Sequence, residues 1–444
     1  MRGTIRELGS RTRAWGTVGG LVDATFVKNT ASLYVIQFAN YLLPLITIPY
    51  LVRVLGPVNY GAVAFAQSLI GYFMVFVDYG FDLSATRKIS VHRQDPATVS
   101  QIAVNTWAAK GLLCVLEFLI LVVITLLIPQ VREIWQLVFV LYGLVVGNVL
   151  FPVWLFQGME RMVAISIINL GMRLLVVIGM LFAVRRPEDY VVYAALLSAG
   201  AFIAGGLGLV IGVHTFGLRL VQPSMSTIWS SLVDGWLLFL ANAAGTVYVL
   251  GNSFILGLLT NYTAVAHYRA GEQLVRAVVG VLSPLARAVY PRSTKIASDS
   301  RLPLLRWAVM LLLGFGSIGL LLSLVLAVSA TVLADLLLGP GYEPVANVIR
   351  ILSPLPFLVA VSYVLGPQVT VSLGLDRIFT VALLVGALVD VILVWLTGPV
   401  WGEAGAALAL LAAEVFVVLA MSLCVWTIWK RHKVGRTRGL TGWT

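Results

Sequence analysis

The feature that most constrains this chain is a succession of apolar runs, each about as long as the twenty residues that a helix needs to cross a bilayer. The runs lie at roughly residues 32–54, 60–80, 102–128, 134–156, 162–184, 189–213, 231–256, 263–289, 304–329, 346–370, 378–397 and 403–428. Because lipid offers no hydrogen-bond partners, each run must satisfy its own backbone as a helix. The sequence therefore predicts an all-α integral membrane protein of about twelve transmembrane helices.

The composition leaves no room for a sizeable soluble domain. Hydrophobic residues make up 60% of the 444 residues and charged residues 11%, whereas soluble domains have about a quarter charged residues. The sequence contains no phosphate-binding P-loop and no cluster of His and Cys with the spacing of metal ligands. We therefore expect a protein that is not an enzyme, with no catalytic residue, no metal and no cofactor.

The net charge of +11 is distributed unevenly along the chain. Most of the 30 Lys and Arg lie before residue 32, after the second and eighth apolar runs, and after residue 428. These segments fall on one side of the predicted helices, so the positive-inside rule places both termini in the cytoplasm. The basic ends are expected to bind membrane lipids, and no nucleic acid is expected as a partner.

Two parts of the chain resemble each other at an offset of 202 residues. The polar residues that recur are Asn40, Asn59 and Tyr60, which match Asn242, Asn261 and Tyr262. This repeat predicts two parallel, pseudo-symmetric lobes of six helices around a central cavity, where transporters of this design bind substrate. The alternative is a duplication that serves folding alone. The expected segments are a basic cytoplasmic N-terminus (1–31), an N-lobe (32–213), a cytoplasmic linker (214–230), a C-lobe (231–428) and a basic cytoplasmic tail (429–444).

Several charged residues fall inside the apolar runs, where an unpaired charge is costly and a partner or water is required. Arg269, Glu272 and Arg276 are spaced by three and four residues, so they share one helix face. Arginine binds phosphate through two parallel hydrogen bonds, which favours an anionic ligand at Arg269 and Arg276. Gln67 occupies the position equivalent to Arg269 in the repeat. Further candidates for the cavity wall are Arg173, Asn40 and Asn242. Arg173 could equally form a structural ion pair with an acid on an adjacent helix.

The buried acids are a second group of candidates. A carboxylate within a membrane helix can carry a proton or bind a coupling ion, and it can equally be a structural partner for a cation. Both interpretations stay open for each of the four residues in this group. They are Glu117, Glu272, Asp390 and Glu414.

Two stretches of sequence resemble a known family. They run from Tyr41 to Arg87 and from Pro152 to Leu175, and the second contains the pattern P-x-W-x-F-Q-G-x-E. The chain resembles the Wzx-type O-antigen and polysaccharide flippases of the multidrug/oligosaccharidyl-lipid/polysaccharide exporter superfamily, over most of its length and most strongly in the first half.

The resemblance implies two six-helix lobes around a cavity that opens to each side of the bacterial inner membrane in turn. The implied substrate is an undecaprenyl-pyrophosphate-linked oligosaccharide, which moves from the inner to the outer leaflet under ion antiport. Cavity arginines of such flippases hold the pyrophosphate, which makes Arg53, Arg269 and Arg276 the best candidates. A polysaccharide polymerase and a chain-length regulator are the implied partners in the pathway.

Other functions compete with this interpretation. A multidrug exporter of the same superfamily would favour an acidic cavity, and the two arginines of the eighth run disfavour it. Lipid II flippases are closer rivals but usually have fourteen spans. A membrane-embedded polymerase or glycosyltransferase would be expected to carry catalytic residues in sizeable external loops, which the sequence lacks. A passive assembly partner would tolerate replacement of its cavity charges.

Overall fold

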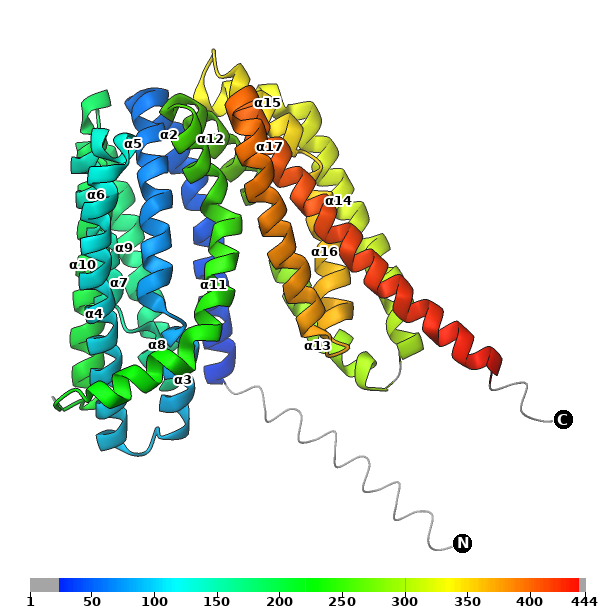
Figure 1. Ribbon diagram of the computed structural model, residues 1–444, viewed down its shortest axis with the longest axis horizontal. Coiled ribbons are helices and arrows are strands. Elements are labelled where there is room, and N and C mark those ends of the chain that lie inside the picture. Colours follow the sequence, from blue (N-terminus) through cyan, green and yellow to red (C-terminus); the bar gives the residue numbers. More distant parts are fainter. Residues whose placement is uncertain (1–23, 220, 300, 439–444) are drawn as a thin grey trace, which may run out of the picture.

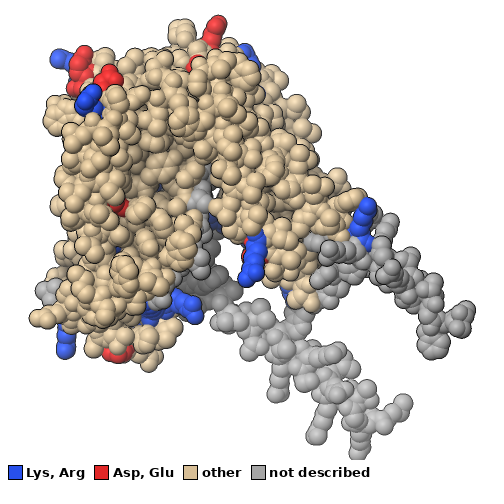
Figure 2. All heavy atoms as spheres, in the orientation of Figure 1, with Lys and Arg blue, Asp and Glu red and all other residues tan. Residues whose placement is uncertain are grey.

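The computed structural model describes residues 24–219, 221–299 and 301–438, and none of these residues forms a strand. Nine stretches of this described chain are helical, long and apolar enough to cross a membrane. Figure 2 shows Lys, Arg, Asp and Glu mainly at the two ends of the molecule, with uncharged residues between them. This distribution is the one that a bilayer imposes, and it confirms the predicted all-α membrane fold.

The described helices form two bundles joined by α11, which spans Met225–Leu259 (Figure 1). The first bundle contains α2 (Ala24–Asp78), α3 (Phe81–Val91), α4 (Pro96–Leu127), α5 (Pro129–Glu133), α6 (Trp135–Leu141), α7 (Gly143–Leu150), α8 (Val153–Gly158), α9 (Met162–Ala183), η1 (Pro187–Asp189) and α10 (Tyr190–Phe216). The second contains α12 (Tyr262–Val279), α13 (Leu282–Asp299), α14 (Arg301–Leu338), α15 (Glu343–Leu352), α16 (Leu355–Tyr363), the π-helical η2 (Val364–Val371) and α17 (Asp376–Arg438).

Two of the long helices each consist of two helices that meet at a glycine. Gly56 in α2 has φ 73° and Gly402 in α17 has φ 55°, and both lie outside the helical region of the backbone map. Positive φ is accessible to glycine at little cost, so the chain can reverse there within one residue. The breaks fall between the apolar runs that were predicted as separate spans.

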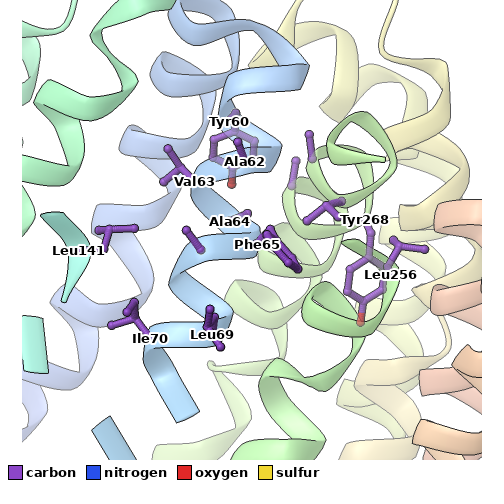
Figure 3. Close-up of a cluster of buried hydrophobic side chains, with 14 of the residues drawn as sticks. Tyr60, Ala62, Val63, Ala64, Phe65, Leu69, Ile70, Leu141, Leu256 and Tyr268 are labelled. Carbon is purple, nitrogen blue, oxygen red and sulfur yellow. The ribbon is translucent and has the colours of Figure 1, made fainter. Parts of the chain in front are cut away.

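The two bundles meet at one end of the molecule and diverge toward the other (Figure 1). We call the end where α2 begins and α17 finishes the terminal end, and the opposite one the distal end. Near the distal end, the second half of α2 packs against α11 and α12. Phe65 of α2 is fully buried in the apolar cluster between these helices (Figure 3). Its ring stacks on that of Phe254 of α11 with centroids 5.5 Å apart.

One helix, α11, belongs to both bundles. Its first turns pack on the first bundle, where Lys88 of α3 donates to the hydroxyl of Ser231 at 3.3 Å. An added Cβ at Gly235 would lie 3.0 Å from the carbonyl oxygen of Tyr79, which shows how closely the two segments approach. The rest of α11 packs against α17 of the second bundle and against α2 of the first.

Small residues let α10 approach its neighbours, as the spacing of Gly200, Ala204, Gly208 and Gly212 predicts. A Cβ added to Gly208 would lie 2.7 Å from the ring of Phe151. A Cβ added to Gly205 would lie 2.4 Å from the carbonyl oxygen of Gly147 on α7, a backbone atom that cannot rotate away.

A side chain at Gly205 should therefore separate α7 from α10. We expect Gly205→Val to destabilise the protein by about 1–3 kcal/mol, the usual cost of overpacking. Gly206→Val is the matched control, because its Cβ would meet no atom within 4 Å. Melting of the purified proteins in detergent measures the difference. Equal melting temperatures for the two variants would contradict this account of the packing.

Candidate functional site

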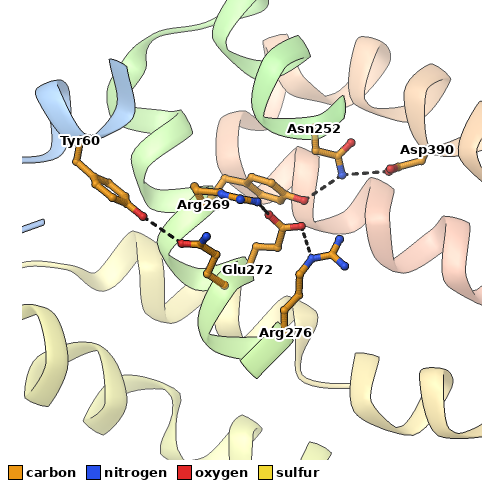
Figure 4. A network of polar contacts seen from close by, with 8 residues as sticks. Tyr60, Asn252, Arg269, Glu272, Arg276 and Asp390 are labelled. Carbon is orange, nitrogen blue, oxygen red and sulfur yellow. Dashed lines mark hydrogen bonds and ion pairs between the residues drawn. The ribbon is translucent and has the colours of Figure 1, made fainter. Parts of the chain in front are cut away.

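The charged face of α12 carries two arginines that share one carboxylate. Glu272 accepts from Arg269 Nη1 at 3.1 Å and from Arg276 Nε at 2.7 Å (Figure 4). The Glu272 side chain is 1% exposed, whereas Arg269 and Arg276 retain 18% and 31% exposure. The carboxylate is thus the fixed centre of the group, and both arginine side chains stay partly exposed beside α12, although Nη2 of Arg276 is buried.

This face of α12 looks toward the first bundle. Gln273 lies four residues after Arg269, and its side-chain oxygen accepts from the hydroxyl of Tyr60 of α2 at 3.4 Å. With a rise of about 1.5 Å per residue, Arg269 lies about 10 Å and Arg276 about 21 Å along α12 from its distal start at Tyr262. Arg276 is therefore deep within the bundle, on the side where the two bundles diverge.

A buried polar chain lies behind this face and ties three helices together. Asn252 Nδ2 of α11 donates to the hydroxyl of Tyr268 at 3.0 Å and to Asp390 Oδ1 of α17 at 3.2 Å (Figure 4). All three side chains are almost fully buried. Asp390 Oδ2 has no hydrogen-bond partner among the described residues. Sequence analysis identified Asp390 but missed Asn252 and Tyr268, because their partners are distant in the chain.

A second group of charges lies in the first bundle. Lys110 of α4 is fully buried and donates to Asp78 Oδ1 of α2 at 2.9 Å. Asn148 of α7 completes the group by donating to Asp78 Oδ2 at 3.2 Å. Glu117 lies seven residues after Lys110 and is 1% exposed, and its two carboxyl oxygens have no hydrogen-bond partner among the described residues.

The remaining predicted residues are spread over the molecule. Arg173 of α9 is exposed and lines a cavity within the first bundle. Gln67 hydrogen-bonds to Tyr193 of the same bundle. Asn242 is exposed on α11, and Glu414 is buried in α17. The side chain of Asn40 lies outside the described part of the structure. Among the predicted substrate residues whose side chains the structure describes, only Arg269 and Arg276 are therefore brought together.

Arg53 occupies a different place from the other predicted arginines. Its Nη2 donates to the carbonyl oxygen of Leu336 of α14 at 2.7 Å, at the distal end. Tyr342 donates to the carbonyl oxygen of Val52 at 3.3 Å in the same region. Arg53 thus connects the two bundles where they meet, at some distance from the charged face of α12.

Further contacts close the distal end. Tyr262 donates to the carbonyl oxygen of Gln130 at 2.7 Å, and Gln130 Nε2 donates to that of Leu258 at 3.0 Å. A Cβ added to Gly61 would lie 1.7 Å from the carbonyl oxygen of Tyr262, so glycine is required there. We use the term distal contact for these interactions and those of Arg53 and Tyr342.

The residues of the P-x-W-x-F-Q-G-x-E pattern lie at the terminal end, where they contact α3 and the segment after it. Thr86 of α3 donates to the carbonyl oxygen of Trp154 at 3.0 Å, and Arg93 Nε donates to that of Gly158 at 3.1 Å. Arg93 also pairs with Glu160 at 2.9 Å, and this hydrogen bond holds the pKa of the Glu160 carboxyl below its ordinary value. The pattern therefore fixes α8 against α3 and the segment that follows it.

Comparison with known proteins decides the family. The sequence pattern of the polysaccharide biosynthesis protein family matches residues 26–297. This chain belongs to that family. It is 33% identical to the "Putative O-antigen transporter" of Escherichia coli (strain K12) over 401 residues, which cover 90% of this chain and 96% of the relative. A protein of the same name from Shigella dysenteriae is 27% identical over 89% of this chain and 98% of its own length.

Solved structures agree on the fold. The inward closed conformation of the lipid II flippase MurJ matches with a TM-score of 0.67 at 11% identity, covering 90% of this chain and 87% of that one. An inward-facing multidrug resistance transporter of the MATE family and MOP superfamily matches with a TM-score of 0.66 at 12% identity, covering 92% and 99%. The family member described here thus has the fold that these two membrane proteins share.

Gly61 offers a test of the distal contact. We expect Gly61→Val to push α2 away from α12, because the added side chain would overlap the carbonyl oxygen of Tyr262. Spin labels on Val58→Cys and Glu343→Cys, in a background with Cys114→Ala and Cys424→Ala, should report a longer mean distance. Gly111→Val is the control, since its Cβ would meet nothing within 4 Å. An unchanged distance in Gly61→Val would refute the role of this glycine.

Proposed function

We propose that this protein moves an undecaprenyl-pyrophosphate-linked oligosaccharide from the inner to the outer leaflet of the bacterial inner membrane. The observation that carries the proposal is the pair Arg269 and Arg276, held by one buried carboxylate on the face of α12 that looks toward the other bundle. The O-antigen transporters named above are consistent with this substrate class.

The charges of this face suit a pyrophosphate. Two guanidinium groups against one carboxylate leave a local excess of positive charge, and both phosphate groups of the linkage are negative. Glu272 also orients the two side chains before the ligand arrives, which reduces the entropy lost on binding. A phosphate head group cannot cross bare hydrocarbon at acceptable cost, whereas a hydrated, cationic path removes much of that cost.

Transport then requires access from each side in turn. The terminal end carries the basic segments and corresponds to the cytoplasm under the positive-inside rule, with both termini on that side. The bundles diverge toward this end, so the head group enters there while the polyprenyl tail stays in lipid. Release to the other side requires the distal contact to open, together with the apolar packing of α2 against α11 and α12 beside it.

The buried acids are the candidates for ion coupling. Asp390 is the strongest of them, because one of its carboxyl oxygens has no hydrogen-bond partner among the described residues and it lies behind the charged face of α12. Glu272 links the two arginines directly. Glu117 and Glu414 are buried elsewhere, and a proton or a sodium ion would satisfy the proposal equally.

The rival functions predict other chemistry at this face. In a multidrug exporter of cationic compounds, Arg269 and Arg276 would repel the positively charged substrate. A lipid II flippase would use the same phosphate chemistry and differ in the glycan. Purified protein incubated with labelled lipid-linked sugar separates a transporter from an enzyme, because a transporter leaves the lipid chemically unchanged.

The proposed partners of this protein are a polysaccharide polymerase and a chain-length regulator, which would use the translocated oligosaccharide in the same biosynthetic pathway.

Loss of Arg276 tests the phosphate site. In a strain that lacks its own flippase, Arg276→Ala and Arg276→Lys should lower surface polysaccharide about tenfold or more at normal protein level, because Lys cannot replace the planar fork. Arg350→Gln is the control, since Arg350 is an exposed distal arginine that donates to Asn347 at 2.8 Å. Full surface polysaccharide with both Arg276 variants would disprove the proposed role.

Asp390→Asn tests ion coupling. The amide preserves the shape of the carboxyl and still accepts from Asn252, so the protein should fold normally. We expect transport in proteoliposomes to lose its response to an imposed proton or sodium gradient, while the exposed variant Glu343→Gln responds as the wild type does. An intact gradient response in Asp390→Asn would remove Asp390 from the coupling mechanism.

A further inference from the structure

The first bundle contains a cavity that the charged face of α12 does not explain. Its volume is about 540 Å³, and it lies among α2, α7, α9 and α10. Such a volume is typical of a small-molecule site, where an apolar wall carries a few polar groups that fix the ligand. The polar groups here include Asp78, Asp82, Asn148 and Arg173.

The charges around this cavity cancel. Asp78 is paired with the buried Lys110, which donates from behind the wall at 2.9 Å. Asp82 contributes a second carboxylate and Arg173 a second cation. Two negative and two positive groups leave no net formal charge, in contrast to the face of α12. Such a site selects neither an anion nor a cation by charge, and it favours a neutral ligand.

The cavity wall also offers partners for both the hydroxyl groups and the apolar C–H face of a sugar ring. Carboxylate and amide oxygens accept hydrogen bonds from hydroxyls, and the amide of Asn148 and the guanidinium of Arg173 donate to them. Phe151 and Tyr193 line the same cavity and offer apolar ring surface to the C–H groups of a sugar. Asp78 keeps 27% of its side chain exposed despite its ion pair, so a ligand can reach it.

The cavity and the phosphate site lie at similar depth. Helices α2 and α12 pack side by side from the matched residues Tyr60 and Tyr262 at the distal end. Asp78 is eighteen residues beyond Tyr60 and Arg276 fourteen beyond Tyr262. At about 1.5 Å per residue, the two groups lie about 27 Å and 21 Å from that end. The two groups therefore differ by about 6 Å in depth along these parallel helices.

We infer that the cavity of the first bundle binds the glycan of the lipid-linked substrate while α12 binds its pyrophosphate. The inference rests on the proposed function and adds that the two bundles bind different parts of the substrate. The first bundle then recognises which sugar is carried, and the second recognises the linkage that is common to all such lipids.

Two variants isolate the cavity. Asp82→Ala removes a polar group whose carboxyl makes no hydrogen bond that the structure records, and Ala204→Leu fills the space from α10. Ala195→Leu is the matched control, because Ala195 is an exposed residue of the same helix and does not line the cavity. Size-exclusion profiles and melting temperatures establish that all variants fold.

Binding is measured with three lipids in detergent: farnesyl pyrophosphate, the same lipid carrying one N-acetylglucosamine, and the lipid-linked repeat unit extracted from the organism that encodes this chain. The wild type should bind at least one glycan-bearing lipid more tightly than farnesyl pyrophosphate. Asp82→Ala and Ala204→Leu should each reduce that gain about tenfold, equivalent to 1.4 kcal/mol. They should leave binding of farnesyl pyrophosphate unchanged, and Arg276→Ala should weaken all three.

The outcomes separate the two proposals. A wild type that gains nothing from the glycan overturns the inference, as do cavity variants that keep the full gain or that weaken all lipids equally. The last result would mean that the cavity holds the polyprenyl chain that all three lipids contain. Loss of the gain in the cavity variants, together with an Arg276→Ala variant that binds normally, overturns the phosphate site on α12 and leaves the assignment of the glycan to the cavity standing. A wild type that binds none of the lipids overturns both.

Discussion

The structure depends on a single carboxylate that makes two arginines tolerable inside a membrane. A guanidinium exposed to acyl chains is costly, and a charged side chain in this environment must find a partner or water. Glu272 supplies the partner for Arg269 and Arg276 at once. Because Glu272 is buried and the arginines are partly exposed, the charge that remains is directed outward from α12.

The distribution of polar groups gives the two bundles different properties. The second bundle combines the cationic face of α12 with the chain of Tyr268, Asn252 and Asp390 behind it. The first bundle has an enclosed group in which Lys110 and Asp78 neutralise each other beside a cavity. An apolar contact around Phe65 and a close approach at Gly61 separate the two regions. On the inference that the cavity binds the glycan, the substrate contacts both regions.

Local patterns in the sequence predicted much of the fold, and long-range pairing could not be predicted in the same way. Apolar runs located the helices, since a span depends on its own residues. The spacing of Arg269, Glu272 and Arg276 predicted a shared face for the same reason. The pairing of Lys110 with Asp78, and of Asp390 with Asn252, joins different helices and required the fold. The exact number of spans also stays a prediction.

The contact of Arg53 is a further example of a long-range pairing that the sequence could not predict. The resemblance made this residue a phosphate candidate by type, but its side chain reaches a backbone carbonyl of α14 at the distal end. Residue type alone cannot distinguish an arginine that binds a ligand from one that connects two helices. Only the partner atom, here the oxygen of Leu336, makes the distinction.

The shared helix α11 limits how the two bundles can move. Its start lies against α3 near Lys88, and its later turns pack on both α17 and α2. A helix that contacts both bundles restricts their relative orientation, so a rotation that opens the distal contact requires α11 to bend or to slide along one of its neighbours. Changes in the packing of α11 are therefore coupled to the side on which the protein is open.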